Sequence, residues 1–308
     1  MSIIMGADLA GMGAANFATL APSLVTLPGG TFTMGGRDFE DTNPHEVTVS
    51  AFKMGRNPVT NDAYGTFVVD SLKTNRFALI GSHVQTGEEK LLALGGSMGE
   101  IRTAAGSVLD SLFSQDEEMA IGGSRILMGA LKMVHIPDHN PPANFDRPQQ
   151  PAVNVSWYGA FVYAALHNVR LLREAEFEYA ARVVQGERKL HDYATPSGKM
   201  KKEEAHFDAG ATIEVDDPKY PTLANGLRHL MGQVWEWQGD WYGGYPNGSV
   251  TDPIGPAHGQ YKVLRGGSWI NNVPDYLRAS YRYGFVPEDR LYVIGFRVAS
   301  SLSASPQD

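Results

Sequence analysis

Residues 226–248 read GLRHLMGQVWEWQGDWYGGYPNG, a stretch dense in glycine and in aromatic side chains. The chain holds five tryptophans, all in this stretch or in blocks on either side of it: Trp157, Trp235, Trp237, Trp241 and Trp269. Such a composition is typical of folds built from tight turns and structured loops, in which large aromatic side chains anchor regular elements that bury little surface themselves. We therefore expect the tryptophans to form the core rather than to stack on a ligand.

The blocks before this stretch predict two helices. Residues 151–168 indicate a short strand followed by a helix that Ser156 caps, because its hydroxyl can accept a hydrogen bond from the first helical turn. Residues 170–184, RLLREAEFEYAARVV, predict a second helix. Its three glutamates are Glu174, Glu176 and Glu178. At this spacing we expect them to pair with Arg170 or Arg182 rather than to act as catalytic carboxylates.

The last strands of the chain are predicted at residues 262–272 and 293–301. Three glycines, Gly266, Gly267 and Gly295, flank or interrupt these strand-like runs. We expect them to supply positive φ angles or close backbone approaches, not a phosphate cradle.

The N-terminal part of the chain predicts strands followed by a helix. Residues 24–36 indicate two short strands around a Pro-Gly-Gly turn. Residues 45–55 alternate apolar and polar side chains, as one half-buried strand does. Thr60 is the expected N-cap of a helix that runs through Val68.

Residues 73–150 differ in character and are interpreted as an insertion packed on the main domain. They contain one amphipathic helix, at about 100–114, and a Pro-rich end for which a linker is the alternative. His135, Asp138 and His139 have a spacing that ligates metal on a helix, but the prolines around them do not permit a regular helix. We expect solvated loop residues and predict no metal site there.

The composition of the chain excludes several kinds of functional site and partner. The 308 residues include no cysteine, which excludes disulfides, thiolate metal ligands and cysteine nucleophiles. The formal net charge is −8 and the basic residues are scattered, so we expect no nucleic-acid partner. No long apolar run occurs, so we predict no membrane span. The first residues lack the basic start of a secretory signal, which makes the cytoplasm the default compartment, with the cell surface or a phage particle as alternatives.

Several blocks, taken in order, resemble the sulfatase-modifying-factor domain of the formylglycine-generating enzymes. They are FTMGG, NPVTNDAYGTF, PAVNVSWYGAF, RLLREAEFEYAAR, NGLRHLMGQVWEW, VLRGGSW and IGFRVA, which begin at residues 32, 57, 151, 170, 225, 263 and 294. The resemblance implies an α+β, C-type-lectin-like fold with a small twisted sheet, two helices and many structured loops. It also implies a single such domain over residues 24–308, with the insertion at about 73–150, preceded by an N-terminal segment of residues 1–23.

The chain differs from these enzymes at the positions of their catalytic metal ligands. The resemblance implies a copper-binding cysteine pair between Trp269 and Arg282, but this segment reads WINNVPDYLRASYR and holds no thiol. The calcium sites of the family involve the block in which Gln233 replaces an asparagine and Glu236 is retained, so a structural calcium ion is left as an alternative. We predict no catalytic residues, no metal ligands and no other cofactor.

Another branch of the fold, the variable proteins of diversity-generating retroelements, is similar in the layout of its C-terminal block. In that branch, sites diversified at adenines lie between GGSW and GFR, and such sites never become Lys, Glu, Gln, Met or Trp. The framework-like residues of this interval are Pro274, Leu277, Arg278, Ala279, Arg282, Pro287, Glu288 and Arg290. The remaining residues of the interval include none of the five excluded types.

This resemblance implies a ligand-binding protein with a diversified surface at about residues 270–293. The expected binding residues are Ile270, Asn271, Asn272, Val273, Tyr276, Tyr281, Tyr283, Gly284, Phe285, Val286, Asp289, Leu291, Tyr292 and Val293. We expect a protein ligand rather than a carbohydrate, because the surface is rich in tyrosine, as antibody paratopes are, and no calcium–carbohydrate motif is visible. The alternatives are an enzyme of the same family with non-thiol metal chemistry, or a degenerate, inactive relative.

Overall fold

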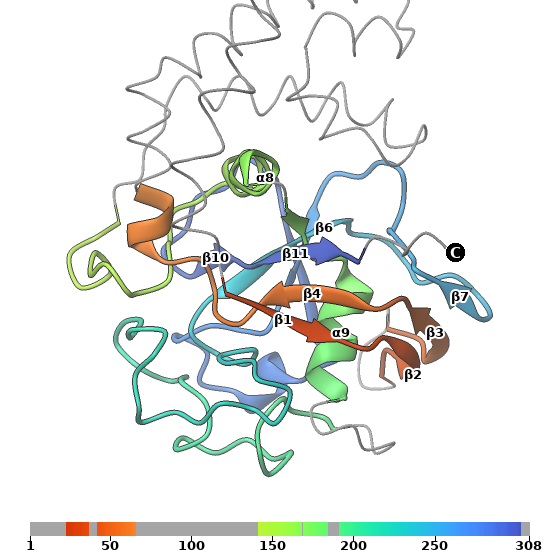
Figure 1. The fold of residues 1–308 in the computed structure, drawn as a ribbon, viewed down its shortest axis with the longest axis horizontal. Helices are drawn as coiled ribbons and strands as arrows, with labels where there is room; N and C mark the ends of the chain where they lie inside the picture. Colours follow the sequence, from red (N-terminus) through yellow and green to blue (C-terminus); the bar gives the residue numbers. More distant parts are fainter. Residues whose placement is uncertain (1–22, 37–41, 66–140, 168, 184–190, 303–308) are drawn as a thin grey trace, which may run out of the picture.

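The computed structural model describes residues 23–36, 42–65, 141–167, 169–183 and 191–302. Small sheets, two α-helices and long loops make up this part of the chain (Figure 1). The elements are β1 (Leu24–Leu27), β2 (Gly30–Met34), β3 (His45–Val49), β4 (Phe52–Gly55), α8 (Trp157–Leu166), β5 (Arg170–Leu171), α9 (Glu174–Arg182), β6 (Trp235–Trp241), β7 (Val250–Thr251), β8 (Lys262–Arg265), the 3-10 helix η2 (Pro274–Leu277), β9 (Arg282–Phe285), β10 (Ile294–Phe296) and β11 (Val298–Ser301).

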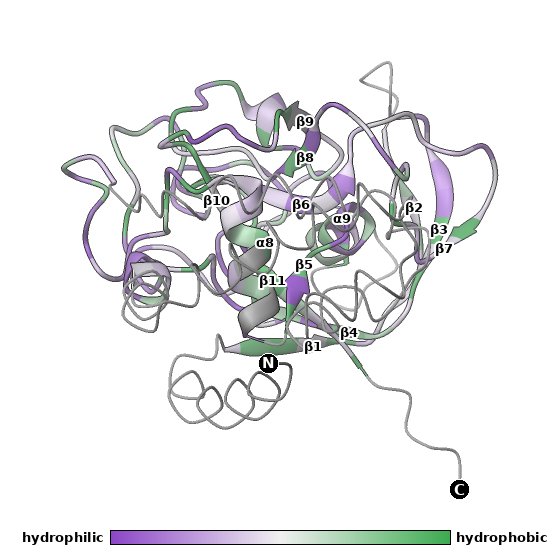
Figure 2. Ribbon diagram, turned by 90° about the horizontal axis from the view of Figure 1, so that it is seen from above, coloured by the Kyte–Doolittle hydropathy of each residue, from purple (hydrophilic) through white to green (hydrophobic). Residues whose placement is uncertain are grey.

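The strands form three sheets, with orders β1-β4-β11-β5, β10-β6-β8-β9 and β2-β3-β7. The first sheet joins the N-terminal strands to the last strand of the chain, since β11 pairs with β4. The second sheet carries the C-terminal block, and in Figure 2 its strands β8 and β9 lie on the side of the molecule opposite β1 and β4. This α+β architecture is the one expected from the sequence.

The predicted half-buried strand at residues 45–55 is two strands instead of one. β3 and β4 join different sheets, and the chain turns between them at Ser50 and Ala51. Asp252 holds the turn, because its carboxylate accepts hydrogen bonds from the Ser50 amide at 2.7 Å and the Ser50 hydroxyl at 2.6 Å. The two strands predicted around the Pro-Gly-Gly turn are present as β1 and β2, also in different sheets.

The second predicted helix begins later than expected. Arg170 and Leu171 form β5 against β11, and α9 starts at Glu174. Asp240 supplies the missing cap from β6, since its carboxylate accepts the Glu174 backbone N–H at 2.7 Å. The sequence could not show this cap, because the two residues are 66 positions apart.

The expected helix caps elsewhere are confirmed. The hydroxyl of Ser156 accepts the backbone N–H of Gly159 at 3.1 Å at the start of α8. The hydroxyl of Thr60 accepts the backbone N–H of Ala63 at 3.4 Å, in a helical turn at residues 61–65.

The tryptophans form the core, with one exception. Trp157, Trp235, Trp237 and Trp269 are buried, whereas Trp241 is only half-buried, so its assignment to the core is wrong. Trp157 and Trp237 bond across the junction of α8 and β6: the first donates its indole N–H to Gln238 O at 2.7 Å and the second to Val155 O at 2.9 Å. Trp241 lies at the edge of this core and shares the Lys262 ammonium with Trp157, at 3.9 Å and 4.0 Å from the two ring centres.

The Pro-rich end of the predicted insertion packs against the main domain. Within residues 141–150, Phe145 is buried and its ring centre lies 5.3 Å from that of Trp269. Asn61 donates to Phe145 O at 2.6 Å, which fastens this segment to the first helical turn. The predicted helix at 100–114 and the residues His135, Asp138 and His139 lie outside the described residues.

Candidate binding surface

The sheet β10-β6-β8-β9 gives the C-terminal block two faces. Side chains on a strand alternate between the faces, so Arg282 and Gly284 point to one side of β9 and Tyr283 and Phe285 to the other. Arg282 is buried, whereas Tyr283 is 46% exposed. Adjacent side chains on β9 therefore point alternately to the interior and to the surface.

Arg282 fastens β9 to the interior. Its guanidinium donates to both carboxylate oxygens of Glu174, at 2.8 Å and 2.7 Å, and to Gly243 O at 2.6 Å. The rings of Tyr242 and Tyr245 lie 4.3 Å from it. Burial by itself would lower the pKa of Arg282, but the Glu174 carboxylate raises it above the ordinary value, so the ion pair stays charged.

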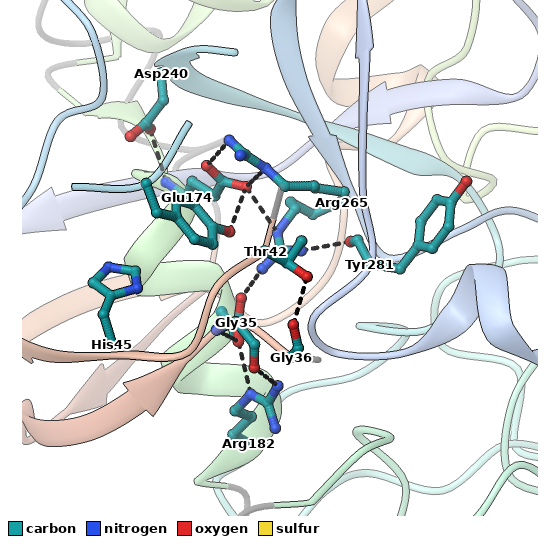
Figure 3. A network of polar contacts seen from close by, with 12 residues as sticks. Gly35, Gly36, Thr42, His45, Glu174, Arg182, Asp240, Arg265 and Tyr281 are labelled. Carbon is teal, nitrogen blue, oxygen red and sulfur yellow. Dashed lines mark hydrogen bonds and ion pairs between the residues drawn. The ribbon is translucent and has the colours of Figure 1, made fainter. Parts of the chain in front are cut away.

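A buried network extends from this ion pair toward α9 and β8. Arg265 lies 3.5 Å from Glu174 and also pairs with Glu178, which Arg182 contacts at 2.7 Å. Arg265 further donates to Tyr281 O, and Figure 3 shows the Tyr281 ring pointing away from the network while its carbonyl faces Arg265. The interior thus holds the backbone of the C-terminal block at Tyr281, whose half-buried ring packs against Trp235 and Tyr276.

The expected pairing of the α9 glutamates is confirmed in part. Glu176 pairs with Arg170 at 2.6 Å and Glu178 with Arg182, as predicted. Glu174 binds Arg282 instead, a residue 108 positions away that local helix spacing could not indicate.

Six of the fourteen predicted binding residues are exposed. They are Ile270, Asn272, Val273, Tyr276, Tyr283 and Tyr292, and we call them the displayed residues. Their large apolar members are between 40% and 48% exposed, which is unusual for side chains of this size outside an interaction surface.

The displayed tyrosines pack against buried and half-buried aromatic rings. Trp235 is buried and lies 5.8 Å from the Tyr281 ring and 6.1 Å from the Tyr283 ring. Tyr281 in turn contacts Tyr276 at 5.2 Å, and Tyr283 contacts Phe285 at 5.3 Å. These five rings form one continuous aromatic row.

A second aromatic group lies beside the first. Tyr292 contacts Trp269 and Phe145, in each case at 5.8 Å between ring centres. Val293 packs against the core cluster that contains Trp235 and against the one that contains Trp269, so it links the two groups. Phe145 was not among the predicted site residues, because it lies in the insertion and no sequence pattern connects it to the C-terminal block.

The other eight predicted binding residues are half-buried: Asn271, Tyr281, Gly284, Phe285, Val286, Asp289, Leu291 and Val293. Two of them have structural roles. The Asn271 side chain accepts the Ser268 backbone N–H at 2.7 Å. A Cβ atom on Gly284 would lie 3.0 Å from the Tyr242 ring and 3.1 Å from Tyr261 Cβ, so a larger residue fits only if its neighbours shift.

Half of the eight framework-like residues are interior: Leu277, Ala279, Arg282 and Pro287 are buried. Arg278 and Arg290 are half-buried, and Arg278 bonds to Asp275 at 3.0 Å. Pro274 and Glu288 are exposed, although the Glu288 carboxylate accepts a hydrogen bond from the Tyr158 hydroxyl at 3.4 Å.

The glycines of the last strands behave as expected. Gly266 and Gly267 have φ angles of 94° and 72°. Gly295 sits against backbone, since a Cβ there would lie 2.7 Å from Ala152 O. At all three positions the chain is so closely packed that a Cβ atom would meet its neighbours at 3.0 Å or less.

Gln233 and Glu236, the residues of the block for which a calcium ion was left as an alternative, are both bonded to other groups of the protein. Gln233 exchanges hydrogen bonds of 3.0 Å with the backbone N–H and carbonyl of Ile213, and both oxygens of Glu236 accept from Arg297. Within the described ranges, no group of three or more His, Asp or Glu side chains is arranged to hold a metal ion. The same ranges contain no helix that is long and apolar enough to cross a membrane.

Comparison with known proteins places these features in a family. The model of the sulfatase-modifying factor enzyme 1-like domain matches residues 12–302. The chain is 27% identical to the formylglycine-generating enzyme of Streptomyces coelicolor, over 90% of the chain and 88% of that protein. It is 30% identical to the inactive C-alpha-formylglycine-generating enzyme 2 of Mus musculus, over 93% of the chain and 88% of that protein.

Two further comparisons concern how much of a longer protein the chain covers and which solved structures share its fold. The chain is 29% identical to the serine/threonine-protein kinase pkn1 of Chlamydia caviae over 92% of its own length, but it spans only 38% of that protein. Among solved structures, Treponema denticola variable protein 1 matches with a TM-score of 0.57 and 19% identity, over 91% of this chain and 95% of that one. The likeness shows that the two share a fold, and it confirms the C-type-lectin-like, α+β prediction.

Proposed function

The chain belongs to the sulfatase-modifying factor enzyme 1-like domain family, and from this premise we propose that it is a non-catalytic member that binds a ligand through the displayed residues of segment 270–293. The family contains both an active formylglycine-generating enzyme and a relative named as inactive, so membership alone decides neither function. The proposal rests on the site.

One observation carries the proposal: the segment separates residues that hold the fold from residues that face the solvent. Leu277 is fully buried next to Tyr276, which is 40% exposed. Arg282 is clamped by Glu174 next to the exposed Tyr283. A surface whose side chains change between copies of a gene needs such a separation, because binding can then vary while stability does not.

The chemistry of the displayed residues favours a protein ligand. Tyrosine offers a large contact area with a polar end and few rotatable bonds, so it binds with little loss of side-chain entropy. Aromatic anchors can each contribute 2 kcal/mol or more to a protein interface. Outside the framework-like residues, the interval between GGSW and GFR also holds only residue types that adenine-directed diversification allows, which supports a variable surface.

The alternative of a copper oxidase is disfavoured by composition. The chain has no cysteine, so the thiolate pair of the formylglycine-generating enzymes has no counterpart in it. Incubation with copper, oxygen and a cysteine-containing sulfatase peptide should give no turnover above a control without protein. Turnover in this assay would contradict the non-catalytic assignment.

A pair of display libraries tests the binding proposal directly. In the first, the six displayed residues are randomised. In the matched control, six buried positions are randomised: Leu277, Ala279, Ser280, Arg282 and Pro287 of the same segment, and Ile294, which directly follows it. Most members of the first library should resist protease digestion, and selection against a panel of purified proteins should enrich binders. Loss of protease resistance as frequent as in the control library, or no enrichment against any protein, would contradict the proposal.

A further inference from the structure

Glu236 lies on β6 in a position that water does not reach. It is 1% exposed, and its two carboxylate oxygens lie 2.8 to 3.2 Å from the guanidinium nitrogens of Arg297. Arg297 itself is fully buried, between β10 and β11. A buried carboxylate needs a cation or a proton, and this one has a cation supplied by the chain.

The same guanidinium is surrounded by backbone oxygens. Arg297 donates to Gly55 O at 2.9 Å, Arg56 O at 2.8 Å, Arg228 O at 2.9 Å and His229 O at 3.3 Å. Together with the Glu236 carboxylate, these carbonyls surround the guanidinium with a cage of oxygens from residues 55–56 and from the distant segment 228–236. Carbonyl and carboxylate oxygens are also the ligands that calcium prefers.

We propose that the Arg297 guanidinium is the resident cation of this cage, so that the fold holds no calcium ion at Glu236. A calcium ion would need oxygens at about 2.3–2.6 Å and would have to stand where the guanidinium stands. Gln233, the other residue of the block, is turned to Ile213 and offers its amide there. The cage has the chemistry of a cation site, and a side chain of the protein fills it.

The surroundings of the cage agree with a fixed positive charge. Burial, together with the neighbouring Arg228 and Arg297 charges, lowers the pKa of His229 to about 3. The imidazole is therefore neutral beside the guanidinium, and it bonds to Val215 O at 3.0 Å. Burial raises the pKa of Glu236, and Arg297 opposes this by favouring the carboxylate.

The wild-type protein provides the first test and needs no variant. Its melting temperature should be the same in excess calcium and in EDTA. A calcium-dependent rise that disappears in Glu236→Gln would overturn the proposal, because Glu236 would then be a calcium ligand.

Removal of the internal cation provides the second test. Arg297→Ala leaves the Glu236 charge unpaired and four carbonyls without donors, so the melting temperature should fall by roughly 10 °C. Added methylguanidinium at low concentration should restore part of the loss. The matched control is Arg170→Ala, which removes a similar pair with Glu176 at a site that is partly open to water, and it should lose little and gain nothing from methylguanidinium. An Arg297→Ala protein that melts like wild type would overturn the proposal; if this variant does not fold, the calcium titration of the wild type decides.

Discussion

In the sheet β10-β6-β8-β9, the same face is buried at β6 and exposed at β9. Trp237 on β6 pairs with Leu264 on β8, and Leu264 pairs with Tyr283 on β9, so the three side chains share a face within about 10 Å. Trp237 is fully buried, whereas Tyr283 is 46% exposed. Helix α8 covers the first end, where Tyr163 packs on Phe296 of β10 with ring centres 5.3 Å apart.

The two ends of this face differ in how their aromatic rings are supported. The aromatic rings at the covered end pack in the core of the sheet. The backbone at the open end is held from the other face of the sheet, where Arg282 and Arg265 reach the α9 glutamates. We therefore expect the fold to depend on the side chains that face inward and to tolerate change in those that face outward.

Truncation of the covered end should have the largest effect. Trp237→Ala creates a cavity and removes the indole donor to Val155 O, so the free energy of unfolding should fall by about 3–5 kcal/mol. Urea denaturation measures this loss. If Trp237→Ala unfolds at the wild-type urea concentration, Trp237 is not part of the core and the comparison fails.

Removal of the interior anchor of β9 should have the next largest effect on the free energy of unfolding. Arg282→Met leaves Glu174 without its bidentate partner, and the cost should be about 3 kcal/mol, at the lower end of the range for buried pairs because Arg265 remains near Glu174. The control is Arg278→Met, at a partly exposed arginine in the same segment, which should cost less than about 1 kcal/mol. Equal losses in the two variants would show that β9 is not held through Arg282.

The cap of α9 should make stability depend on pH. Burial and the nearby Glu174 charge raise the pKa of Asp240 to about 7, although the Lys262 charge opposes the rise. The folded state therefore takes up a proton that the unfolded state does not hold between about pH 4 and pH 7, and stability from this group is lost as the pH rises through 7. Denaturation of wild type and Asp240→Asn at pH 5 and pH 8 should show the variant gaining stability relative to wild type at the higher pH. A difference between the two proteins that is independent of pH would contradict the assignment.

The fold followed from the sequence because its signals are local. Ser156 and Thr60 cap helices where they stand, and the tryptophans lie in blocks whose order matches a known family. Trp241 was assigned wrongly because it is the last residue of β6, where the strand is only half-buried, and the block pattern does not show this.

The sequence indicated which segment forms the candidate site, but not which of its side chains face the solvent. A rule about which residue types occur cannot distinguish Tyr283, which faces solvent, from Gly284, which has Tyr242 and Tyr261 against it. Arg282 was identified as a framework-like residue, but its partner Glu174 was missed, since the two meet only once the chain is folded. The contact between the buried Phe145 and Tyr292 was missed for the same reason.

The smallest effect on stability should come from the displayed tyrosines, and it tests the central claim. Tyr276, Tyr283 and Tyr292, changed together to serine, should lower the free energy of unfolding by less than about 2 kcal/mol, because exposed substitutions usually shift it by only about 0.5 kcal/mol each. Leu277→Ser, a single change beside Tyr276 at a fully buried position, should cost more than about 3 kcal/mol. Urea denaturation of the two variants against wild type is the deciding measurement. A small loss in the triple variant and a large one in Leu277→Ser is the predicted result, and a triple variant as unstable as Leu277→Ser would show that these tyrosines belong to the core.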